Sequence, residues 1–364
     1  MNILHVYGHF YPCIGGVENQ IENLCLNLIS LGHTSDVCCL NTCADLKEKL
    51  DSYEKYKGIN IYRIPYKDFK YYKIAPKVLK IVKKYDVIHV HGLGFFVDYL
   101  ASMKRFHKKP LILSTHGGIF HTKKLMLLKN LYFYFWSKHK LKNVDRIIAV
   151  SKNDEKLFSR ICKNIIFIPD GIDFETYSRI KRTPEKNTLL FIGRLSPNKR
   201  IDRLLSVILI LKDKIPGIKL YIVGKDWKGH EKILKETVKR KNLEKNIIFT
   251  GGVSENGKLD YLKKAGLFVS ASEYEGFGVS VLEAMAAGVP VIVNDIDSFR
   301  NFVRNGENGF IIDYSNPEKA ADIILKINRQ NLPRISEHAK KTANEYDMFD
   351  LAKNVERVYS EAVD

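Results

Sequence analysis

The sequence predicts an α/β protein built from two doubly wound, parallel-sheet domains. Short β-rich apolar runs alternate with longer amphipathic runs along nearly all of the 364 residues. The apolar runs lack polar alternation, which is typical of parallel sheets that are covered by helices on both faces. The length suits two domains of roughly 100–200 residues each. We therefore expect two Rossmann-like sheets that face each other across a cleft.

The first half of the chain contains the clearest patterns. In Val17–Leu31, apolar residues recur at spacings of three and four, which indicates a helix, and Gly32 marks its end. Similar helical patterns separate most of the strands of this half. These strands are expected at Asn2–Gly8, Asp36–Asn41, Ile59–Pro65, Val87–His91, Leu111–His116, Arg146–Ser151 and Ile165–Pro169.

The second half repeats the alternation after a polar stretch, Phe174–Asn187, which we expect to be a linker. The two domains are therefore predicted at residues 1–174 and 175–349. Strands are expected at Thr188–Gly193, Lys219–Gly224, Ile247–Gly251, Leu267–Ala271, Pro290–Asn294 and Gly309–Asp313. Helices are expected at Arg200–Lys212, His230–Arg240, Asn256–Lys264, Val279–Ala287 and Pro317–Ile327.

The composition excludes several classes of protein. With 45% hydrophobic and 27% charged residues, the chain is not mostly disordered. No apolar run approaches the ~20 residues that cross a bilayer. Met1–His5 runs into a strand pattern without the basic start of a signal peptide. None of the six cysteines forms a C-x-x-C pair, so we expect reduced thiols in a cytoplasmic protein and no zinc or redox motif.

The net charge of +18 is the least ordinary property of the composition. Residues 1–174 hold 27 basic and 15 acidic residues, so two thirds of the excess lies in the first half. Such a charge attracts polyanions, which include nucleic acids, anionic lipids and phosphorylated small molecules.

Ligands of open parallel sheets bind beyond the carboxyl ends of the strands, so the loops there are the candidate site. Gly15 and Gly16 separate the first strand from a helix whose N-terminus can approach an anion. Arg194 and Lys199 lie five positions apart across a Ser-Pro turn, and such a pair can grip a diphosphate. Taken alone, the glycine turn could be structural and the cations could be solvated surface groups.

The loop and helix in Ser272–Pro290 carry the strongest pattern. Gly276 and Gly278 expose the backbone at a helix N-terminus, where a phosphate is favoured. Glu275 precedes this helix and Glu283 lies within it, so two carboxylates could accept hydrogen bonds from the hydroxyls of one bound molecule. The alternative is that Glu283 is a half-buried structural acid.

These two glutamates, with seven residues between them, lie in E-G-F-G…E-A-M-A-A-G-V-P-V-I. Other motifs follow in order: G-G-V-E at Gly15–Glu18, D-V-I-H-V-H-G at Asp86–Gly92, S-T-H-G at Ser114–Gly117, D-R-I-I-A-V-S at Asp145–Ser151, I-P-D-G-I-D at Ile168–Asp173 and G-R-L-S-P-N-K at Gly193–Lys199. From residue 2 to about residue 350, the chain resembles family 4 of the retaining glycosyltransferases (GT4), which have the GT-B fold.

The resemblance implies roles for individual residues. Arg194 and Lys199 would neutralise the departing nucleoside diphosphate, Glu275 would hold sugar hydroxyls, and Glu283 would bind the ribose diol. His116 would lie near the sugar, and the last helix, in Asp350–Asp364, would pack back on the first domain. The catalytic residues implied are Arg194, Lys199, Glu275 and His116. The donor-binding residues implied are Gly15, Gly16, Arg194, Lys199, Glu275, Gly276, Phe277, Gly278, Val279 and Glu283.

The reaction implied is a retaining, metal-independent transfer of a hexose-type sugar from a UDP- or GDP-linked donor. The acceptor would be a hydroxyl of a glycan or lipid-linked molecule, in the synthesis of a cell-surface polysaccharide such as lipopolysaccharide. No cofactor is expected. Two alternatives remain open, a GT-B nucleotide-sugar epimerase and a basic nucleic-acid-binding protein. An epimerase would turn over the donor alone, and no zinc-finger, RNP or OB pattern supports nucleic-acid recognition.

The chain also departs from the family pattern. Asp170 stands where the family often has Asn, and Asp295–Arg300 replaces a Gly-rich turn followed by Pro-Glu. Asp295 and Asp297 form a D-x-D pattern, but two acids in a turn usually cap backbone amides. His89, His91, His116 and His121 could suggest zinc, although histidines beside an anion site need no metal. We therefore expect no metal.

The stretch between Asp98 and Asp145 has ten Lys and Arg residues and no acidic residue. It contains Leu131–Trp136, six consecutive large apolar residues, which one core face of a helix cannot cover. Lysines beside aromatic residues are typical of helices that lie on anionic lipid. Residues 119–142 therefore either bind the inner face of the plasma membrane peripherally or pack against the partner domain or the acceptor pocket.

Overall fold

The computed structural model describes residues 1–13, 15–43, 48–69, 72–116, 126–328 and 332–363. The chain divides into two compact units, one formed by Met1–Gly171 with Met348–Asp364 and the other by Ile172–Asp347. The predicted boundary between residues 174 and 175 lies three residues too late. Part of the predicted linker is helix α8 (Phe174–Ser178), which buries Tyr177 in the second unit.

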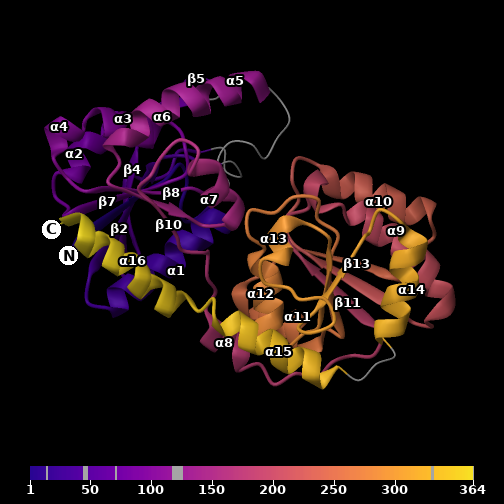
Figure 1. Cartoon of the computed structure of the whole chain (residues 1–364). Coiled ribbons are helices and arrows are strands. Elements are labelled where there is room, and N and C mark those ends of the chain that lie inside the picture. Colours follow the sequence, from indigo (N-terminus) through magenta and orange to yellow (C-terminus); the bar gives the residue numbers. More distant parts are fainter. Residues whose placement is uncertain (14, 44–47, 70–71, 117–125, 329–331, 364) are drawn as a thin grey trace. The chain divides into compact units, whose positions relative to one another are not determined.

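The first unit is built on an eight-stranded sheet with the order β10-β9-β8-β7-β1-β2-β4-β3 (Figure 1). All neighbouring strands are parallel except the edge pair β3–β4. The strands are β1 (Asn2–Val6), β2 (Thr34–Leu40), β3 (Tyr53–Tyr56), β4 (Ile59–Ile64), β7 (Val87–His91), β8 (Leu111–Ser114), β9 (Arg146–Ala149) and β10 (Ile165–Phe167).

Helices flank this sheet. They are α1 (Gly16–Ser30), α2 (Val78–Val82), α3 (Phe95–Ser102), α4 (Lys104–His107), α5 (Met126–Leu131), the π-helix η1 (Tyr132–Ser137), α6 (Lys138–Lys140), the 3₁₀ turn η2 (Leu141–Asn143), α7 (Lys152–Phe158) and α16 (Met348–Val363). A separate antiparallel hairpin joins β5 (Lys67–Phe69) to β6 (Tyr72–Ile74). Strands β3, β5 and β6 were not predicted from the sequence, because they are short and contain no buried residue.

The second unit has a six-stranded, all-parallel sheet with the order β13-β12-β11-β14-β15-β16. Its strands are β11 (Thr188–Ile192), β12 (Lys219–Val223), β13 (Ile247–Gly251), β14 (Leu267–Ser270), β15 (Val291–Asn294) and β16 (Phe310–Ile312). Besides α8, its helices are η3 (Pro197–Lys199), α9 (Ile201–Lys214), α10 (His230–Arg240), α11 (Glu255–Lys264), α12 (Val279–Ala286), α13 (Asp297–Arg300), α14 (Pro317–Asn328) and α15 (Pro333–Asn344). Two parallel α/β sheets confirm the predicted fold class.

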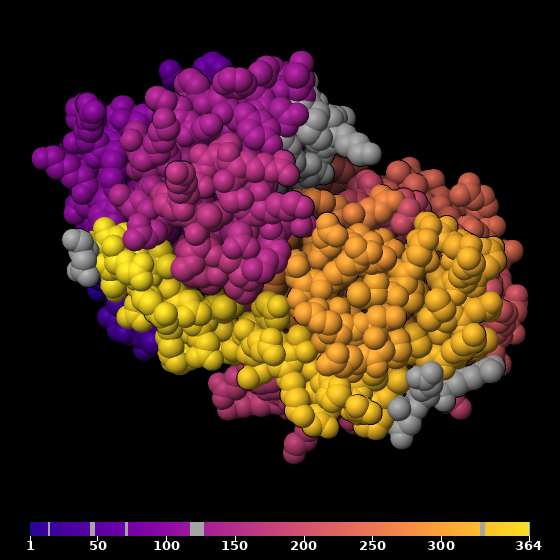
Figure 2. Space-filling view, in the orientation of Figure 1, coloured from indigo at the N-terminus to yellow at the C-terminus, as the bar shows by residue number. Residues whose placement is uncertain are grey.

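The C-terminal helix α16 belongs to the first unit and lies beside α1 (Figure 1). Its buried side chains, among them Leu351 and Val355, pack on Ile3, Val87 and Ile112 of the sheet. The other face of the helix is exposed, and α16 is part of the yellow surface in Figure 2. The first unit is therefore assembled from both ends of the chain.

The prediction of six reduced thiols is wrong for one pair. Cys13, in the loop after β1, and Cys43, in the loop after β2, form a disulfide. Their Cα atoms lie 5.6 Å apart, because the carboxyl ends of these two neighbouring strands meet at the same edge of the sheet. Cys25, Cys38, Cys39 and Cys162 are free.

Candidate active site

The strand order of the second sheet places two of the candidate loops side by side. The order reverses between β11 and β14, and such a switch point is where open α/β sheets bind ligands. The loop after β11 contains Asn198, whose carbonyl accepts a hydrogen bond from the Glu273 amide at 2.9 Å. The Asn198 side chain also donates to the Tyr274 carbonyl at 3.1 Å. The two loops are therefore tied together at the carboxyl edge of the sheet.

The central contact of this edge is the ion pair between Lys199 and Glu275. Lys199 Nζ lies 2.6 Å from each carboxylate oxygen of Glu275, and each side chain is about 15% exposed. The buried Ser272 donates its hydroxyl to Glu275 Oε1 at 2.7 Å. Both charged residues were predicted from the sequence, whereas Ser272 was not. Together they place a cation and an acceptor for hydroxyl groups at one point.

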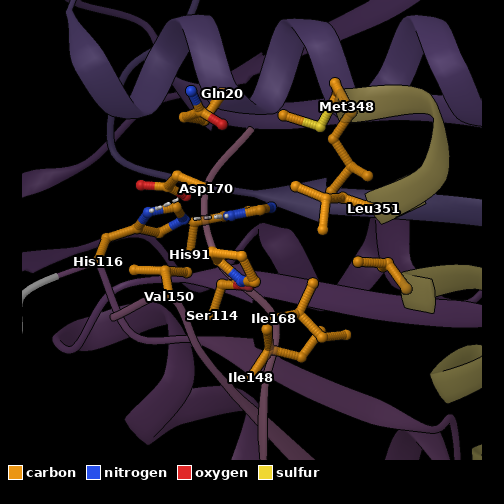
Figure 3. A pocket seen from close by; sticks show the side chains of 13 residues that line it. Gln20, His91, Ser114, His116, Ile148, Val150, Ile168, Asp170, Met348 and Leu351 are labelled. Carbon is orange, nitrogen blue, oxygen red and sulfur yellow. Dashed lines mark hydrogen bonds and ion pairs between the residues drawn. The ribbon is translucent and has the colours of Figure 1, made fainter. Parts of the chain in front are cut away.

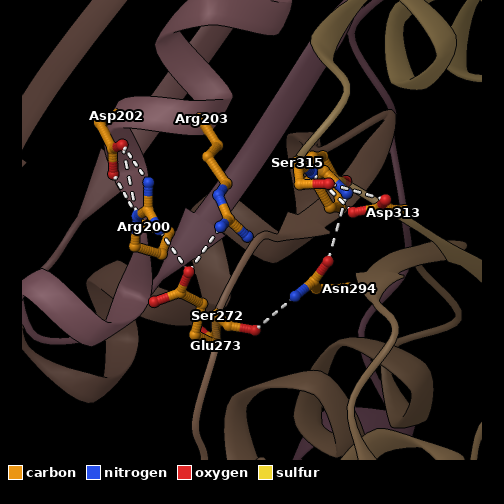
Figure 4. A network of polar contacts seen from close by, with 9 residues as sticks. Arg200, Asp202, Arg203, Ser272, Glu273, Asn294, Asp313 and Ser315 are labelled. Atoms are coloured by element: carbon orange, nitrogen blue, oxygen red, sulfur yellow. Dashed lines mark hydrogen bonds and ion pairs between the residues drawn. The ribbon is translucent and has the colours of Figure 1, made fainter.

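A second network holds the same loop in place (Figure 4). Glu273 accepts hydrogen bonds from Arg200 and Arg203, and Asp202 pairs with Arg200. Asn294, at the end of β15, donates to the Ser272 carbonyl at 3.0 Å. These contacts hold the loop that carries Glu275 against the start of α9 and the end of β15.

The N-terminus of α12 has the exposed backbone that the sequence predicts. Gly276 is exposed, while Gly278 is buried and has a φ of +106°. A Cβ atom on Gly278 would lie 2.7 Å from Phe299 Cε1, so only glycine fits there. Phe277 is buried in the core of the unit and Val279 is half-buried. The amides of this turn lie at the positive end of the helix dipole, which favours an anion.

Glu283 lies one to two turns into α12 and is held by two residues that the sequence analysis missed. Glu283 Oε1 accepts a hydrogen bond from the Tyr177 hydroxyl at 2.8 Å and another from Lys258 Nζ at 2.9 Å. Burial and the Glu283 charge raise the pKa of Tyr177, so its hydroxyl stays protonated. The only sequence signal was a lysine on the buried face of α11, four positions before the buried Leu262.

Arg194 lies two residues after the end of β11 and is exposed. It has no ion-pair partner among the residues that the structure describes. Its guanidinium is therefore available to a ligand at the edge of the sheet, although Arg194 does not contact Lys199 or Glu275. The structure thus brings Lys199 and Glu275 into contact and leaves Arg194 and Glu283 separate from that pair.

The acids of the D-x-D pattern pair with a neighbouring arginine. Arg300 Nε lies 2.6 Å from Asp295 Oδ1, and Arg300 Nη1 lies 3.6 Å from Asp297 Oδ1. Both acids are exposed. Arg300 therefore neutralises part of the negative charge that would otherwise attract a divalent cation to these two acids.

In the first unit, Gly15 is the N-cap of α1 and Gly16 is its first residue. Gly15 has an extended backbone, with a φ of −160°, and Gly16 is exposed with no atom within 4 Å of the position of a Cβ. Backbone can therefore approach a ligand closely at this helix N-terminus.

His116 ends a chain of buried imidazoles. His116 Nε2 lies 3.0 Å from His91 Nδ1 (Figure 3), and His91 Nε2 lies 3.0 Å from His5 Nδ1. On the other side, His116 Nδ1 lies 3.7 Å from Asp170 Oδ1. Burial lowers the pKa of His116 to about 4, so its ring is neutral at pH 7. Both ring nitrogens face protein groups, and a φ of +43° fixes the backbone at this residue.

Asp170 is the departure from the family pattern that the structure explains best. Burial, reinforced by the charge of Asp154, raises the pKa of Asp170 to about 8. Its carboxyl group is therefore protonated at neutral pH and can donate a hydrogen bond as an Asn amide does. Asp170, Gln20 and His116 line a cavity of about 30 Å³, which is the space of one water molecule (Figure 3).

Three of the four histidines considered for zinc lie close together, because the ring centres of His89 and His91 are 4.2 Å apart and His91 Nδ1 lies 3.0 Å from His116 Nε2. His121 lies outside the described residues. The ring nitrogens of His5, His89 and His91 lie within 4.8 Å of one another. However, His89 is already hydrogen bonded on both sides, to the Tyr359 hydroxyl at 2.6 Å and to Ser114 Oγ at 2.8 Å. These contacts fix the ring of His89 between β8 and α16.

In the basic, aromatic segment, residues 119–125 lie outside the described residues, and residues 126–140 form the continuous helical run α5–η1–α6, which is magenta at the edge of the first unit in Figure 1. Phe133 packs in the core and Tyr132 donates a hydrogen bond to Asp98 at 2.7 Å. Large apolar side chains on the other faces remain exposed, namely Leu127, Leu128, Leu131, Phe135 and Trp136. Among the described residues, no helix is both long enough and apolar enough to span a membrane.

Comparison with known proteins identifies the family. Residues 14–176 match the family model of glycosyltransferase family 4, and residues 173–345 match that of the glycosyl transferases group 1. A GDP-mannose:cellobiosyl-diphosphopolyprenol alpha-mannosyltransferase of Xanthomonas oryzae is 32% identical over 326 residues, which cover 88% of this chain and 86% of the relative. The corresponding enzyme of Komagataeibacter xylinus is 27% identical and covers 100% of this chain and 94% of the relative.

Solved structures show the same fold. Anabaena HepE in complex with UDP superposes with a TM-score of 0.80 at 19% identity, and the match covers 99% of this chain and 100% of that one. Sucrose-phosphate synthase of Thermosynechococcus elongatus superposes with a TM-score of 0.80 at 18% identity, covering 99% and 98%. With its two family matches and its two parallel sheets, the chain belongs to family 4 of the GT-B glycosyltransferases.

Proposed function

We propose that this chain transfers a hexose-type sugar from a nucleoside diphosphate sugar to a hydroxyl of a lipid-linked glycan, with retention at the anomeric carbon and without a metal. The observation that carries the proposal is the pairing of Lys199 with Glu275 at the switch point of the second sheet. This edge combines a cation, a hydroxyl acceptor and a helix N-terminus. Those are the groups that a sugar joined to a diphosphate requires.

The proposed mechanism follows from where charge develops. As the bond between sugar and phosphate breaks, negative charge grows on the diphosphate and the sugar becomes oxocarbenium-like. Lys199, Arg194 and the N-terminus of α12 would stabilise the diphosphate charge in fixed positions. Glu275 would orient hydroxyls of the sugar, with the amides of Phe277 and Gly278 beside it. The acceptor hydroxyl would attack from the same face and pass its proton to the leaving phosphate, so no protein nucleophile is needed.

We propose GDP-mannose as the donor to test first, because two relatives that match most of this chain are GDP-mannose mannosyltransferases. Their names also give a cellobiosyl-diphosphopolyprenol as acceptor. A diphosphopolyprenol-linked disaccharide is therefore the acceptor class to test, and the synthesis of a cell-surface polysaccharide is the corresponding pathway.

Calorimetric titration with GDP, UDP, ADP and CMP in the presence of EDTA tests the site. We expect one nucleoside diphosphate to bind without metal, and its base narrows the choice of donor. Binding that appears only when Mn²⁺ or Mg²⁺ is added contradicts the metal-free site. Release of GDP from GDP-mannose that depends on the acceptor supports transfer, whereas isomerisation of the donor without acceptor supports an epimerase.

We further propose that the segment of residues 119–142 docks the first unit on an anionic membrane surface. Leu127 and Phe135 are more than 70% exposed, and Trp136 is 52% exposed. Lys138 and Lys142 are exposed beside them, and Lys140 Nζ lies 4.9 Å from the centre of the Trp136 ring. Exposed aromatic side chains among lysines suit the boundary between lipid headgroups and acyl chains. A lipid-linked acceptor would be reached from the same surface.

Co-sedimentation with vesicles tests this docking. We expect binding to vesicles that contain phosphatidylglycerol, which weakens as salt is raised, and little binding to pure phosphatidylcholine. The double variant Phe135→Ser/Trp136→Ser should lose this binding. Phe106→Ser is the matched control, because Phe106 is 75% exposed in the same unit but lies outside the segment. Equal and weak binding to both kinds of vesicle contradicts the proposal.

A further inference from the structure

We propose that Lys258 and Tyr177 are positioning residues that fix Glu283, so that a single carboxylate oxygen, Oε2, is presented to the ribose hydroxyls of the donor. The inference rests on the proposed function and on the ribose-binding role that the family resemblance implies for Glu283. It adds which oxygen of Glu283 is presented and which residues orient it.

The two oxygens of Glu283 have different surroundings. Oε1 accepts one hydrogen bond from the Tyr177 hydroxyl, at 2.8 Å, and another from Lys258 Nζ, at 2.9 Å. Oε2 accepts no hydrogen bond from the part of the chain that the structure describes, and it is not sealed from solvent. A carboxylate oxygen with free lone pairs is an acceptor for hydroxyl groups. The carboxylate therefore presents one satisfied oxygen to the protein and one unsatisfied oxygen to a ligand.

Lys258 is mostly buried and its ammonium contacts protein carboxylates, so it can hold Glu283 in place. Its side chain is 11% exposed, and besides Glu283 it pairs with Glu255 at 2.8 Å. Its ammonium lies 5.1 Å from the centre of the Tyr177 ring. Burial alone would lower the pKa of Lys258, but the charges of Glu283 and Glu255 outweigh it and the pKa is raised. The ammonium thus remains charged and donates at neutral pH.

Three helices meet at this carboxylate. Tyr177 comes from α8, Lys258 from α11 and Glu283 from α12, and Tyr177 and the α12 residues around Glu283 lie in one apolar cluster. Packing therefore limits the rotation of the Glu283 side chain as well as its hydrogen bonding. Oε2 is therefore a hydrogen-bond acceptor that is already in position before a ligand hydroxyl binds to it.

The test compares ribonucleotides with deoxynucleotides. The probe is the nucleoside diphosphate that the wild-type protein binds, together with its 2′-deoxy and 3′-deoxy forms, and the readout is the Kd by calorimetry. We expect the wild type to bind the ribonucleotide about 10-fold or more tightly than at least one deoxy form, since a hydrogen bond to a charged group is lost. In Lys258→Met, the Kd of the ribonucleotide should rise about 10-fold, whereas the Kd of that deoxy form should change by less than about 3-fold.

Tyr177→Phe removes only a hydroxyl and should reduce the same discrimination, so it decides the outcome if Lys258→Met does not fold. Lys258→Arg should recover part of the discrimination. Lys263→Met, an exposed lysine of the same helix, is the matched control and should behave as wild type.

Two results overturn the inference. One is that the wild type binds ribonucleotides and deoxynucleotides with equal affinity. The other is that Lys258→Met lowers the affinity for both by the same factor, which is the result expected if Lys258 only stabilises the fold. In both cases nucleotide binding through Lys199 and Arg194 survives. A wild type that binds no nucleoside diphosphate overturns the proposed function instead, so the two failures can be told apart.

Discussion

Lys199 Nζ lies 2.6 Å from both carboxylate oxygens of Glu275. The two residues come from loops 76 positions apart in the sequence, which the strand order places next to each other. The ion pair carries no net charge. In the proposed mechanism, a diphosphate would draw the Lys199 ammonium partly away from Glu275, and the carboxylate would then be free to accept hydrogen bonds from hydroxyl groups.

Arg194→Ala and Lys199→Ala should each lower turnover by about 100-fold or more, because each removes a fixed positive charge from the developing diphosphate. Steady-state kinetics with donor and acceptor measure this. Arg240→Ala, an exposed arginine on α10, is the control and should retain wild-type rates. Rates near wild type in both site variants are incompatible with the proposed role.

Gly278→Ala should destabilise the second unit by about 2 kcal/mol or more and should abolish donor binding. A side chain there must adopt a φ of +106° and meets Phe299 at 2.7 Å. Gly276→Ala is the matched control, because no atom lies within 4 Å of its Cβ position. Thermal unfolding and nucleotide titration compare the two variants, and equal melting temperatures would disprove the steric argument.

Asp170 should make the wild type lose stability as the pH rises from 6.5 to 8. Burial raises the pKa of Asp170 from 3.8 to about 8, so across this window the folded chain keeps a proton that the unfolded chain has lost. The neutral His116, with a pKa of about 4, contributes stability that is lost only as the pH falls below 6.5. Relative to Asp170→Asn, the wild type should therefore lose up to about 1.4 kcal/mol for each pH unit.

Urea unfolding of both proteins at several pH values between 6.5 and 8 measures this difference. The histidines and other titrating groups are shared, so they cancel in the comparison. Parallel stability profiles would show that Asp170 is ionised in the folded protein.

Activity should persist in EDTA, and the double variant Asp295→Asn/Asp297→Asn should keep most of it. Both carboxylates already pair with Arg300, so they are not free to collect around a divalent ion. Initial rates with and without EDTA, and with Mn²⁺ restored, measure this. Loss of activity in EDTA that Mn²⁺ restores, together with an inactive double variant, would place a metal at these acids.

The fold could be predicted because buried parallel strands leave a strong pattern in the sequence. Val87–His91 and Ile247–Gly251 were predicted with their observed bounds, as was the helix His230–Arg240. Other strands were predicted one or two residues too long at the carboxyl edge. The run ending at His116 is an example: the strand stops at Ser114, and His116 turns to a positive φ although the preceding Thr115 is buried.

The candidate site could be predicted only in part. Lys199, Glu275 and the glycines of the α12 turn lie in local motifs, whereas Lys258 and Tyr177 reach Glu283 from two other helices. Their position depends on how α8, α11 and α12 pack, which no local pattern contains. The pairing of Cys13 with Cys43 was missed for the same reason, since it depends on which strand ends are neighbours.

Because α16 packs on the first unit, it also determines the order in which the two units can be completed during translation. The sheet of the first unit is translated by Gly171, but the helix that covers Ile3, Val87 and Ile112 begins only at Met348. At typical translation rates, this apolar face of the sheet stays uncovered for roughly 10–40 s while the second unit and α16 are synthesised. The second unit can thus fold before the first is complete. A chain that terminates before Met348 would carry a complete second unit attached to an unfinished sheet with an uncovered apolar face.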